Sequence, residues 1–178
     1  MRKGILSLVF LFCASSIVIA QETIQGFIFP EDGSVIWQHE FTTQQSMNDL
    51  FNSLIENRIV TDYEIIENRF SGVLPQLPAN YALAGFKKSK TPKFILAYDC
   101  TANVLIQYKP GKYRVTLHRI RLINNGSDFS FTNPVNLLED FVLNKNGVSK
   151  TFQKSGATIL NTTFIDYFSN INLFNDEW

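Results

Sequence analysis

The feature that most constrains the fold is a fifteen-residue alternation from Phe94 to Tyr108. Every even position in it is apolar or small, and the odd positions between them include Asp99, Thr101, Asn103 and Gln107. A period of two predicts one long, half-buried β-strand. The motif KPGK at 109–112 then predicts a turn, because Pro110 presets φ and Gly111 tolerates a positive φ. A second strand should therefore run back from position 112.

This second strand, KYRVTLHRIRL at 112–122, changes phase near its middle. The apolar residues at 113, 115 and 117 share one face, whereas Ile120 and Leu122 fall on the other. Without a correction Cys100 would face Arg121, and burying that charge would cost several kcal/mol unless it were paired. One extra residue near His118 and Arg119, a β-bulge, would bring Leu122 opposite Cys100 instead. We therefore expect a bulge there.

The segments on either side of the hairpin predict further strands and helices. Residues 21–34 suggest a loose segment, and SVIWQHEF at 34–41 suggests a first strand. Ser46 then resembles an N-cap with Asp49 in the first turn, followed by apolar residues at helical spacing. Short strands are expected at 63–66 and 70–74, and a long loop at 75–93 because of its prolines and Gly85.

The C-terminal third predicts helices. Asn133-Pro134 resembles a helix start, the apolar residues at 137, 138, 141 and 142 form a stripe, and Gly147 is a plausible stop. Apolar residues from 152 to 171 again follow helical spacing. With no internal repeat or composition break, residues 21–178 are expected to form a single α+β domain with a long C-terminal helical segment.

Four short stretches resemble a family of uncharacterised secreted proteins from Bacteroidetes-type bacteria. They are SVIW at 34–37, the capped helix from Ser46, FSGVL at 70–74 and, above all, KPGKYRV at 109–115. The resemblance spans about residues 25–174, and the family's domain has a TATA-box-binding-protein-like fold. It implies a curved antiparallel sheet of about five strands, with helices packed on one face and the other face open. It does not imply DNA binding, because a fold does not determine a function.

The first twenty residues resemble a secretory signal peptide. Arg2 and Lys3 precede an apolar run too short to span a membrane, and Ala20 ends the segment. Phe12 before Cys13 disfavours a lipoprotein anchor, and a buried N-terminal strand or helix is the weaker alternative. Cleavage near Ala20 would leave 158 residues with a net charge near −2 and a single cysteine. We expect an exported chain, periplasmic or secreted, without a transmembrane segment or an intramolecular disulfide.

Motifs for catalysis are not evident. The sequence has no Walker loop, no GxGxxG and no GxSxG, and His39 and His118 lack metal-ligand spacing, so we expect no cofactor and no metal. Cys100 and His118 should lie on opposite faces of the sheet, which excludes them as a nucleophile pair. The alternative left open is a hydrolase of envelope or dietary glycan. Its site would be built from scattered carboxylates and His39 or His118.

The stronger indication is a binding surface. Nine basic residues and one acid lie between Lys87 and Arg121, a local charge of about +8 in a chain with no net charge. Such polarity can attract an anionic envelope ligand, such as phosphate-bearing glycolipid, or an acidic protein, although the lysines could instead be solvated or paired with acids. Export and the acidic mature chain discourage nucleic acid. We expect a non-catalytic binding or assembly module that uses the open sheet face and the basic hairpin, with the candidate residues Asn103, Gln107, Lys109, Lys112, Arg114, Thr116 and His118.

Overall fold

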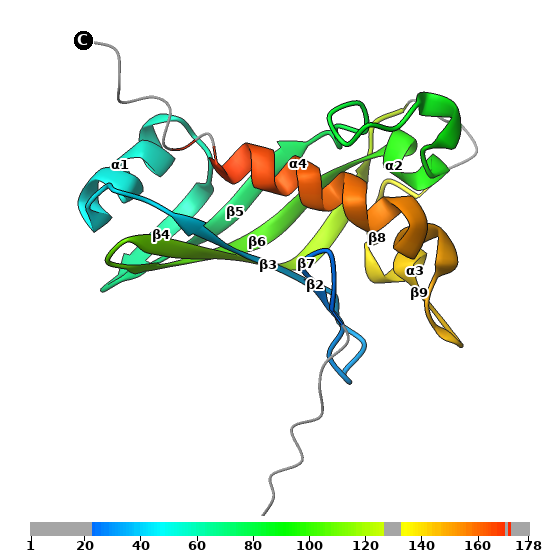
Figure 1. Cartoon of the computed structure of the whole chain (residues 1–178), viewed down its shortest axis with the longest axis horizontal. Helices are drawn as coiled ribbons and strands as arrows, with labels where there is room; N and C mark the ends of the chain where they lie inside the picture. The colour runs from blue at the N-terminus through cyan, green and yellow to red at the C-terminus, as the bar shows by residue number, and fades with distance from the viewer. Residues whose placement is uncertain (1–22, 127–132, 170, 172–178) are drawn as a thin grey trace, which may run out of the picture.

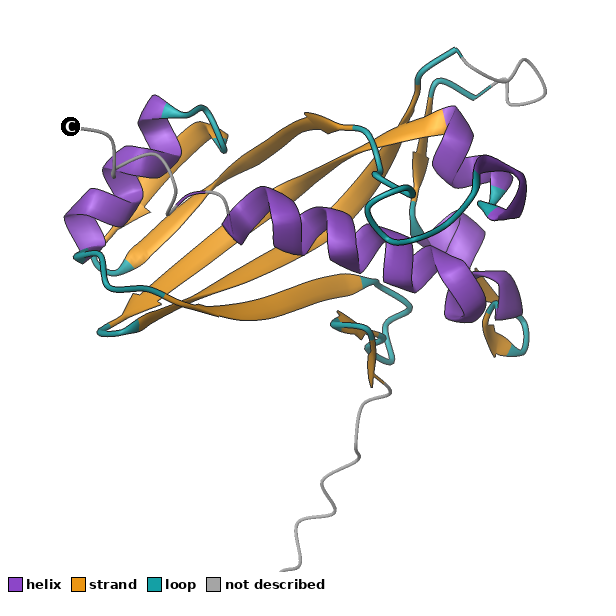
Figure 2. Cartoon of the chain, turned by 45° about the horizontal axis from the view of Figure 1, so that its top comes forward, coloured by secondary structure: helices purple, strands orange, loops and turns teal. Residues whose placement is uncertain are grey.

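The computed structural model describes residues 23–126, 133–169 and 171. They form an α+β fold in which a curved antiparallel sheet has the strand order β1-β2-β3-β7-β6-β5-β4, and β8 also pairs with β7 (Figure 1). The longest helix, α4, crosses one face of this sheet, and Figure 2 shows the other helices toward the two ends on that side. No described helix covers the opposite face, so the sheet has a covered face and an open face. No helix among the described residues is long and apolar enough to cross a bilayer.

The elements are few and mostly short. The strands of the main sheet are β1 (Thr23–Ile24), β2 (Phe27–Ile28), β3 (Ile36–Thr42), β4 (Thr61–Ile66), β5 (Arg69–Leu77), β6 (Tyr98–Lys109), β7 (Lys112–Asn124) and β8 (Val135–Leu137). A separate small hairpin consists of β9 (Leu143–Asn144) and β10 (Gly147–Val148). The helical segments are α1 (Met47–Glu56), the 3-10 turn η1 (Lys88–Lys90), α2 (Lys93–Ala97), α3 (Glu139–Val142), the π-helical turn η2 (Phe152–Gly156) and α4 (Ala157–Ser169).

The β6–β7 hairpin has the predicted turn, register and bulge. Lys109 pairs with Lys112 across the turn, and further along Cys100 pairs with Leu122. The register shifts between Thr101 and Asn103, where β7 carries one extra residue. Arg119 is the bulged residue and has a φ of 51°, in the left-handed region. The bulge keeps Ile120 and Leu122 in the core.

The core lies between the covered face and α4. Phe164 and Phe168 of α4 pack on Trp37 of β3 with ring centroids 5.2 and 6.3 Å apart. Two hydrogen bonds also join the layers. The Trp37 Nε1–H donates to Asn161 Oδ1 at 2.9 Å, and the buried Tyr113 hydroxyl donates to the Phe168 carbonyl at 2.8 Å. The covered face is therefore held to α4 by both apolar packing and satisfied polar groups.

Helix α1 begins as predicted. Ser46 Oγ accepts a hydrogen bond from the Asp49 backbone N–H at 3.3 Å, and Leu50, Phe51 and Leu54 are buried. The strands expected at 63–66 and 70–74 are β4 and β5. Strand β4 is the last strand on its side of the sheet.

The expectation of a strand from Phe94 was wrong for its first four residues, which belong to the helix α2. Its residues Phe94, Ile95 and Ala97 are all buried, so the environment of this turn does not alternate. The Phe94 ring stacks on Phe141 of α3 at 5.2 Å, and the buried Pro92 is the N-cap. A single buried helical turn can also have apolar residues at its even positions. Here tertiary packing, rather than the sequence pattern, decides between a strand and a helix.

The helix expected from Asn133 was also wrong, because residues 135–137 form the strand β8 and only residues 139–142 are helical. Strand β3 covers β7 only from Lys112 to Leu117, so the rest of that edge needs another partner. Residues 135–137 supply it by pairing with 121–123, and the Leu138 N–H donates to the Ile120 carbonyl at 2.9 Å. Only the single turn α3 follows, and Gly147 lies in the β9–β10 hairpin rather than at a helix end.

The first described residues are more ordered than a loose segment. Strands β1 and β2 form a short hairpin around Gly26, whose φ is 79°. The Gly26 carbonyl accepts a hydrogen bond from the Gln38 N–H at 2.9 Å, and Phe27 is fully buried. Three short strands, β1, β2 and β8, thus extend the expected sheet of about five, whose members are β3 to β7.

Candidate functional site

The open face brings the predicted residues of β6 and β7 together in pairs. Gln107 lies opposite Arg114, and Asn103 lies opposite His118. Thr116 lies opposite Leu105 in the same ladder. Because side chains of directly paired residues share a face, these pairs form neighbouring rows across the sheet.

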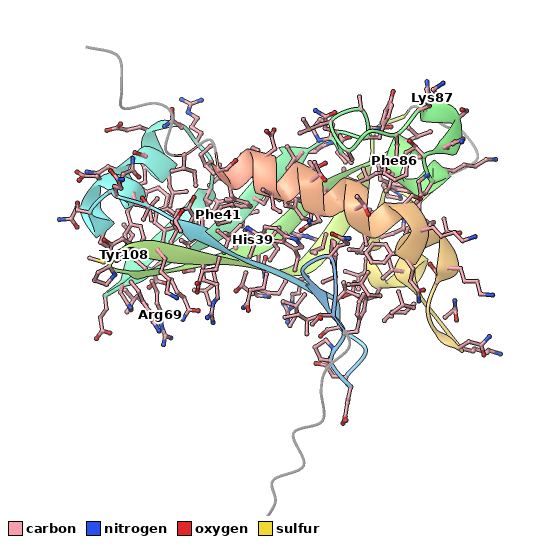
Figure 3. The ribbon with its side chains drawn as sticks, viewed as in Figure 1. His39, Phe41, Arg69, Phe86, Lys87 and Tyr108 are labelled. Atoms are coloured by element: carbon pink, nitrogen blue, oxygen red, sulfur yellow. The ribbon has the colours of Figure 1, made fainter. Side chains whose placement is uncertain are left out.

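The neighbouring strands extend one of these rows into a line of four residues. Glu40 of β3 pairs with Arg114, and Arg69 of β5 pairs with Gln107. The row therefore runs Glu40–Arg114–Gln107–Arg69 across four strands. Arg69 lies on the side of the sheet away from α4, as Figure 3 shows. Two cationic side chains thus flank Gln107 on the open face.

The sequence analysis did not anticipate Arg69 or Glu40. Arg69 immediately precedes the buried Phe70 in β5, so alternation alone would have placed it on the polar face. Its position beside Gln107 depends on β5 pairing with β6, which no local pattern specifies. Glu40 follows the same logic on β3, between His39 and the buried Phe41.

Glu40 neutralises part of the basic hairpin. The Lys112 Nζ lies 2.8 Å from Glu40 Oε1, and the Arg114 Nη2 lies 3.7 Å from Glu40 Oε2. The hydrogen bond from Lys112 lowers the pKa of Glu40, with smaller contributions from the charges of Lys112, Arg114 and Lys109. The prediction that the cations could instead be paired with acids on neighbouring strands is thus correct for Lys112 and, at longer range, for Arg114.

A pocket lies at this end of the hairpin. It encloses about 410 Å³ of empty space, part of it open to solvent. Its lining residues are Glu40, Asn68, Gln107, Tyr108, Lys109, Lys112, Tyr113 and Arg114. Tyr113 is buried and its ring stacks on Phe41, so the accessible lining of the pocket consists mainly of charged and amide side chains.

Neighbouring loops hold the hairpin tip in place. The Gly111 carbonyl accepts a hydrogen bond from the Thr43 N–H at 3.0 Å, and the Tyr108 hydroxyl donates to the Gln45 carbonyl at 3.0 Å. On the other side, Tyr108 and Asn68 exchange two hydrogen bonds of 2.9 and 3.1 Å. The charged side chains of the tip therefore project from a backbone tied down on both sides.

The histidines and the cysteine do not assemble into a reactive group. Burial, with a smaller contribution from Asp99, raises the pKa of Cys100 to about 12, so its thiol stays protonated at neutral pH. His39 lies on the covered face beside Trp37 and Phe41, whereas His118 pairs with Asn103 on the open face. Burial lowers the pKa of both histidines, and the charge of Arg119 lowers that of His118 further. No group of three metal-ligating side chains occurs among the described residues.

The basic run from Lys87 to Arg121 is not one surface. Lys109, Lys112 and Arg114 lie at the turn of the hairpin, whereas residues 87–93 precede the other end of β6. The twelve residues of β6 separate the two groups by about 40 Å at roughly 3.3 Å per residue. In Figure 3 the labelled Tyr108 and Lys87 lie toward opposite ends of the molecule.

The arrangement defines an α+β domain with a curved antiparallel sheet, one face covered by helices and an open, partly cationic face. One solved structure similar to this chain is a TBP-like protein from Parabacteroides distasonis, with 12% identity, a TM-score of 0.48, and coverage of 80% of this chain and 95% of that one. Another is a DUF4468 family protein from Bacteroides ovatus, with 15% identity, a TM-score of 0.44, and coverage of 84% and 94%.

Both neighbours come from Bacteroidetes. At these identities the likeness concerns the fold alone. No protein-family model matches the chain, and no curated protein matches it.

Proposed function

We propose that the protein is an exported, non-catalytic binding or assembly module of the bacterial envelope. Its binding site would be the hairpin-end surface, defined here as Arg69, Gln107, Lys109, Lys112 and Arg114. The ligand would be an anionic group carried by an envelope component or by another protein. The observation that supports this most is the convergence of three cationic side chains of β6 and β7, Lys109, Lys112 and Arg114, on one pocket whose lining includes a single carboxylate. Arg69 of β5 lies beside the pocket residue Gln107 in the neighbouring strand.

The charge balance of the hairpin-end surface favours an anion. Glu40 is bound closely by Lys112 and only at 3.7 Å by Arg114. Arg69 and Lys109 are exposed and form no ion pair within the described residues. A carboxylate or phosphate placed beside Gln107 would meet guanidinium groups from both sides, and guanidinium groups bind such anions through paired hydrogen bonds.

The rigidity of the hairpin tip also supports binding. Loops on both sides hold Gly111 and Tyr108 through backbone hydrogen bonds. Association costs less when the binding groups are already positioned, because fewer side chains and loops lose freedom. The lining of this pocket supports a binding module over the glycan hydrolase, because its one acid is held by cations and it includes no histidine.

The proposal that the protein is exported rests on the sequence. Residues 1–20, the expected signal peptide, lie outside the described residues. A mature chain with a net charge near −2 and an exported location argue against nucleic acid as the ligand of the cationic face. An envelope ligand or a protein partner remains the proposal.

A titration tests the hairpin-end surface directly. Residues 21–178 labelled with ¹⁵N would be titrated with inorganic phosphate, and then used to capture partners from an envelope extract. We expect amide shifts to cluster at residues 69 and 107–114. An Arg69→Gln, Arg114→Gln variant should bind roughly tenfold more weakly per arginine, because a hydrogen bond to a charged group contributes about 1.5–3 kcal/mol.

A matched control removes the same charge elsewhere. Lys145→Gln, Lys150→Gln changes two exposed lysines outside the hairpin-end surface and should leave the phosphate shifts at residues 69 and 107–114 unchanged. Equal weakening by both variants, or shifts scattered over the whole chain, would refute the site. Thermal melting of each variant separates lost binding from lost fold.

A further inference from the structure

A second basic surface lies about 40 Å from the hairpin turn, at the opposite end of β6. Lys87, Lys88, Lys90 and Lys93 are all exposed and occur within seven residues around η1 and the start of α2. No aspartate or glutamate occurs anywhere from residue 68 to residue 98. We propose that this lysine turn, residues 87–93, is a docking surface for an anionic lipid bilayer.

The four lysines form no ion pair within the described residues. The two ion pairs found there both use Glu40, at the other end of the sheet. Asp99, the next acid along the chain, accepts hydrogen bonds from Gln76 Nε2 at 3.1 Å and from Asn125 Nδ2 at 3.2 Å. Four like charges at close spacing repel one another, and an anionic surface would relieve that repulsion.

The lysine turn is ordered by its own hydrogen bonds. Thr91 Oγ1 donates to the Lys87 carbonyl at 3.1 Å, and the Lys90 N–H donates to the same carbonyl at 2.9 Å. Upstream, the Asn80 N–H donates to Thr163 Oγ1 of α4 at 2.9 Å, which ties the preceding loop to the longest helix. The positive charges are therefore presented at a defined place on the molecule.

An exposed apolar side chain lies close to the lysines in the sequence. Leu83 is 50% exposed and precedes Lys87 by four residues, in a turn closed by the hydrogen bond from the Phe86 N–H to the Tyr81 carbonyl at 2.9 Å. An apolar side chain beside several lysines is the combination found where proteins rest on membrane surfaces. The lysines would contact headgroups, and Leu83 would enter the interface between headgroups and acyl chains.

The type of cation favours a bilayer over an acidic protein. All four charges of the turn are lysines, and three further exposed lysines lie on elements near α2, at 145, 150 and 154. Contacts place these elements together. Phe94 stacks on Phe141, and a Cβ on Gly156 would lie 3.5 Å from the Phe94 ring. Protein interfaces are enriched in arginine and depleted in lysine, whereas lysine suits the diffuse attraction of a charged lipid layer.

The acids at this end of the molecule are already engaged. Glu139 Oε1 accepts a hydrogen bond from the Val35 N–H at 2.9 Å, and Asp140 Oδ2 accepts one from the Leu137 N–H at 3.0 Å. Neither forms an ion pair with a lysine of the turn. Both carboxylates keep their negative charge, but the seven exposed lysines at this end outnumber them.

Vesicle flotation tests the proposal. The chain from residue 21 to 178 would be mixed with vesicles of phosphatidylcholine alone, or of phosphatidylcholine with phosphatidylglycerol, at low and at physiological ionic strength. We expect binding only to the anionic vesicles, weakened by salt. Removing one lysine should weaken binding about fivefold, so Lys87→Gln, Lys88→Gln should weaken it about 25-fold. Leu83→Ser should weaken it further.

The matched control removes two units of positive charge elsewhere. Arg58→Glu, at an exposed residue outside both basic surfaces, changes the net charge equally and should leave flotation unchanged. Equal loss in the Lys87→Gln, Lys88→Gln variant and in Arg58→Glu would overturn the assignment to the lysine turn. So would failure of the native chain to float with anionic vesicles. A Leu83→Ser variant that binds as well as the native chain would overturn the contact with the bilayer interior.

Discussion

The bulge at Arg119 provides a sharp test of how this sequence sets its fold. Two changes at the same position should have opposite effects. Arg119→Gly keeps the extra residue and removes a side chain from a backbone with a φ of 51°. Because non-glycine residues are disfavoured there by about 1–2 kcal/mol, and glycine costs some backbone entropy, we expect the free energy of unfolding to be unchanged or to rise by about 1 kcal/mol.

Deleting Arg119 should be strongly destabilising. Without the extra residue, Ile120 and Leu122 would turn to the open face, although both are now at most 1% exposed. Losing the burial of each costs about 1.5–3 kcal/mol, or roughly 3–6 kcal/mol together. Arg121 would then face Cys100 in the core, which adds the cost of a buried charge. The sum approaches the whole stability of a typical domain.

Urea unfolding, followed by circular dichroism, measures both changes. The deletion should shift the midpoint far to lower urea or prevent folding, and Arg119→Gly should not lower it. A deletion variant within about 1 kcal/mol of the native chain would show that the bulge does not hold the register, and the reasoning from alternation would fail. A large loss for Arg119→Gly would show that the side chain, rather than the extra residue, matters.

Two further predictions concern the sheet and the histidines. A Cβ on Gly72 would lie 2.5 Å from Val60 Cγ1 and 2.7 Å from the Thr61 carbonyl oxygen. Gly72→Ala should therefore push β4 away from β5 and lower the free energy of unfolding by about 1–3 kcal/mol. The neighbouring change Ser71→Ala should not lower it by that amount. Burial lowers the pKa of His39 and His118 below 6.5, because the folded state favours the neutral histidines. The stabilisation from the neutral histidines is complete above pH 6.5 and is lost as the pH falls toward the lower pKa values of the folded state. Urea midpoints between about pH 8 and 5 should therefore decline, and His39→Gln, His118→Gln should flatten the decline. An unchanged slope would contradict the assignment.

The β6–β7 hairpin and α1 could be predicted because their signals are local. The alternation, the turn residues and the change of phase are together compatible with only one register between β6 and β7 that buries no charged side chain. Ser46 and the apolar spacing after it specify a helix start without reference to the rest of the chain. In both cases the sequence pattern extends over the whole element, so tertiary contacts did not have to choose between strand and helix.

The errors lie where tertiary packing decides. The residues of α2 are apolar at alternating positions, but Phe94 and Ile95 are both buried against other elements. Residues 135–137 were expected to lie in a helix because of the apolar stripe at 137, 138, 141 and 142. The part of β7 beyond Leu117 instead pairs with them as β8. Arg69 joins the candidate site only because β5 lies beside β6. No short stretch of the sequence specifies which strands lie side by side in the sheet.

The charge pattern shows the same limit in a way that bears on function. In the sequence the cations from Lys87 to Arg121 form one run with a charge of about +8. In the fold, β6 carries its two ends about 40 Å apart, several times the Debye length of about 8 Å at physiological ionic strength. The lysine turn and the hairpin-end surface therefore cannot attract the same small anion. If both bind, the chain holds one ligand at the hairpin while its opposite end rests on a charged surface.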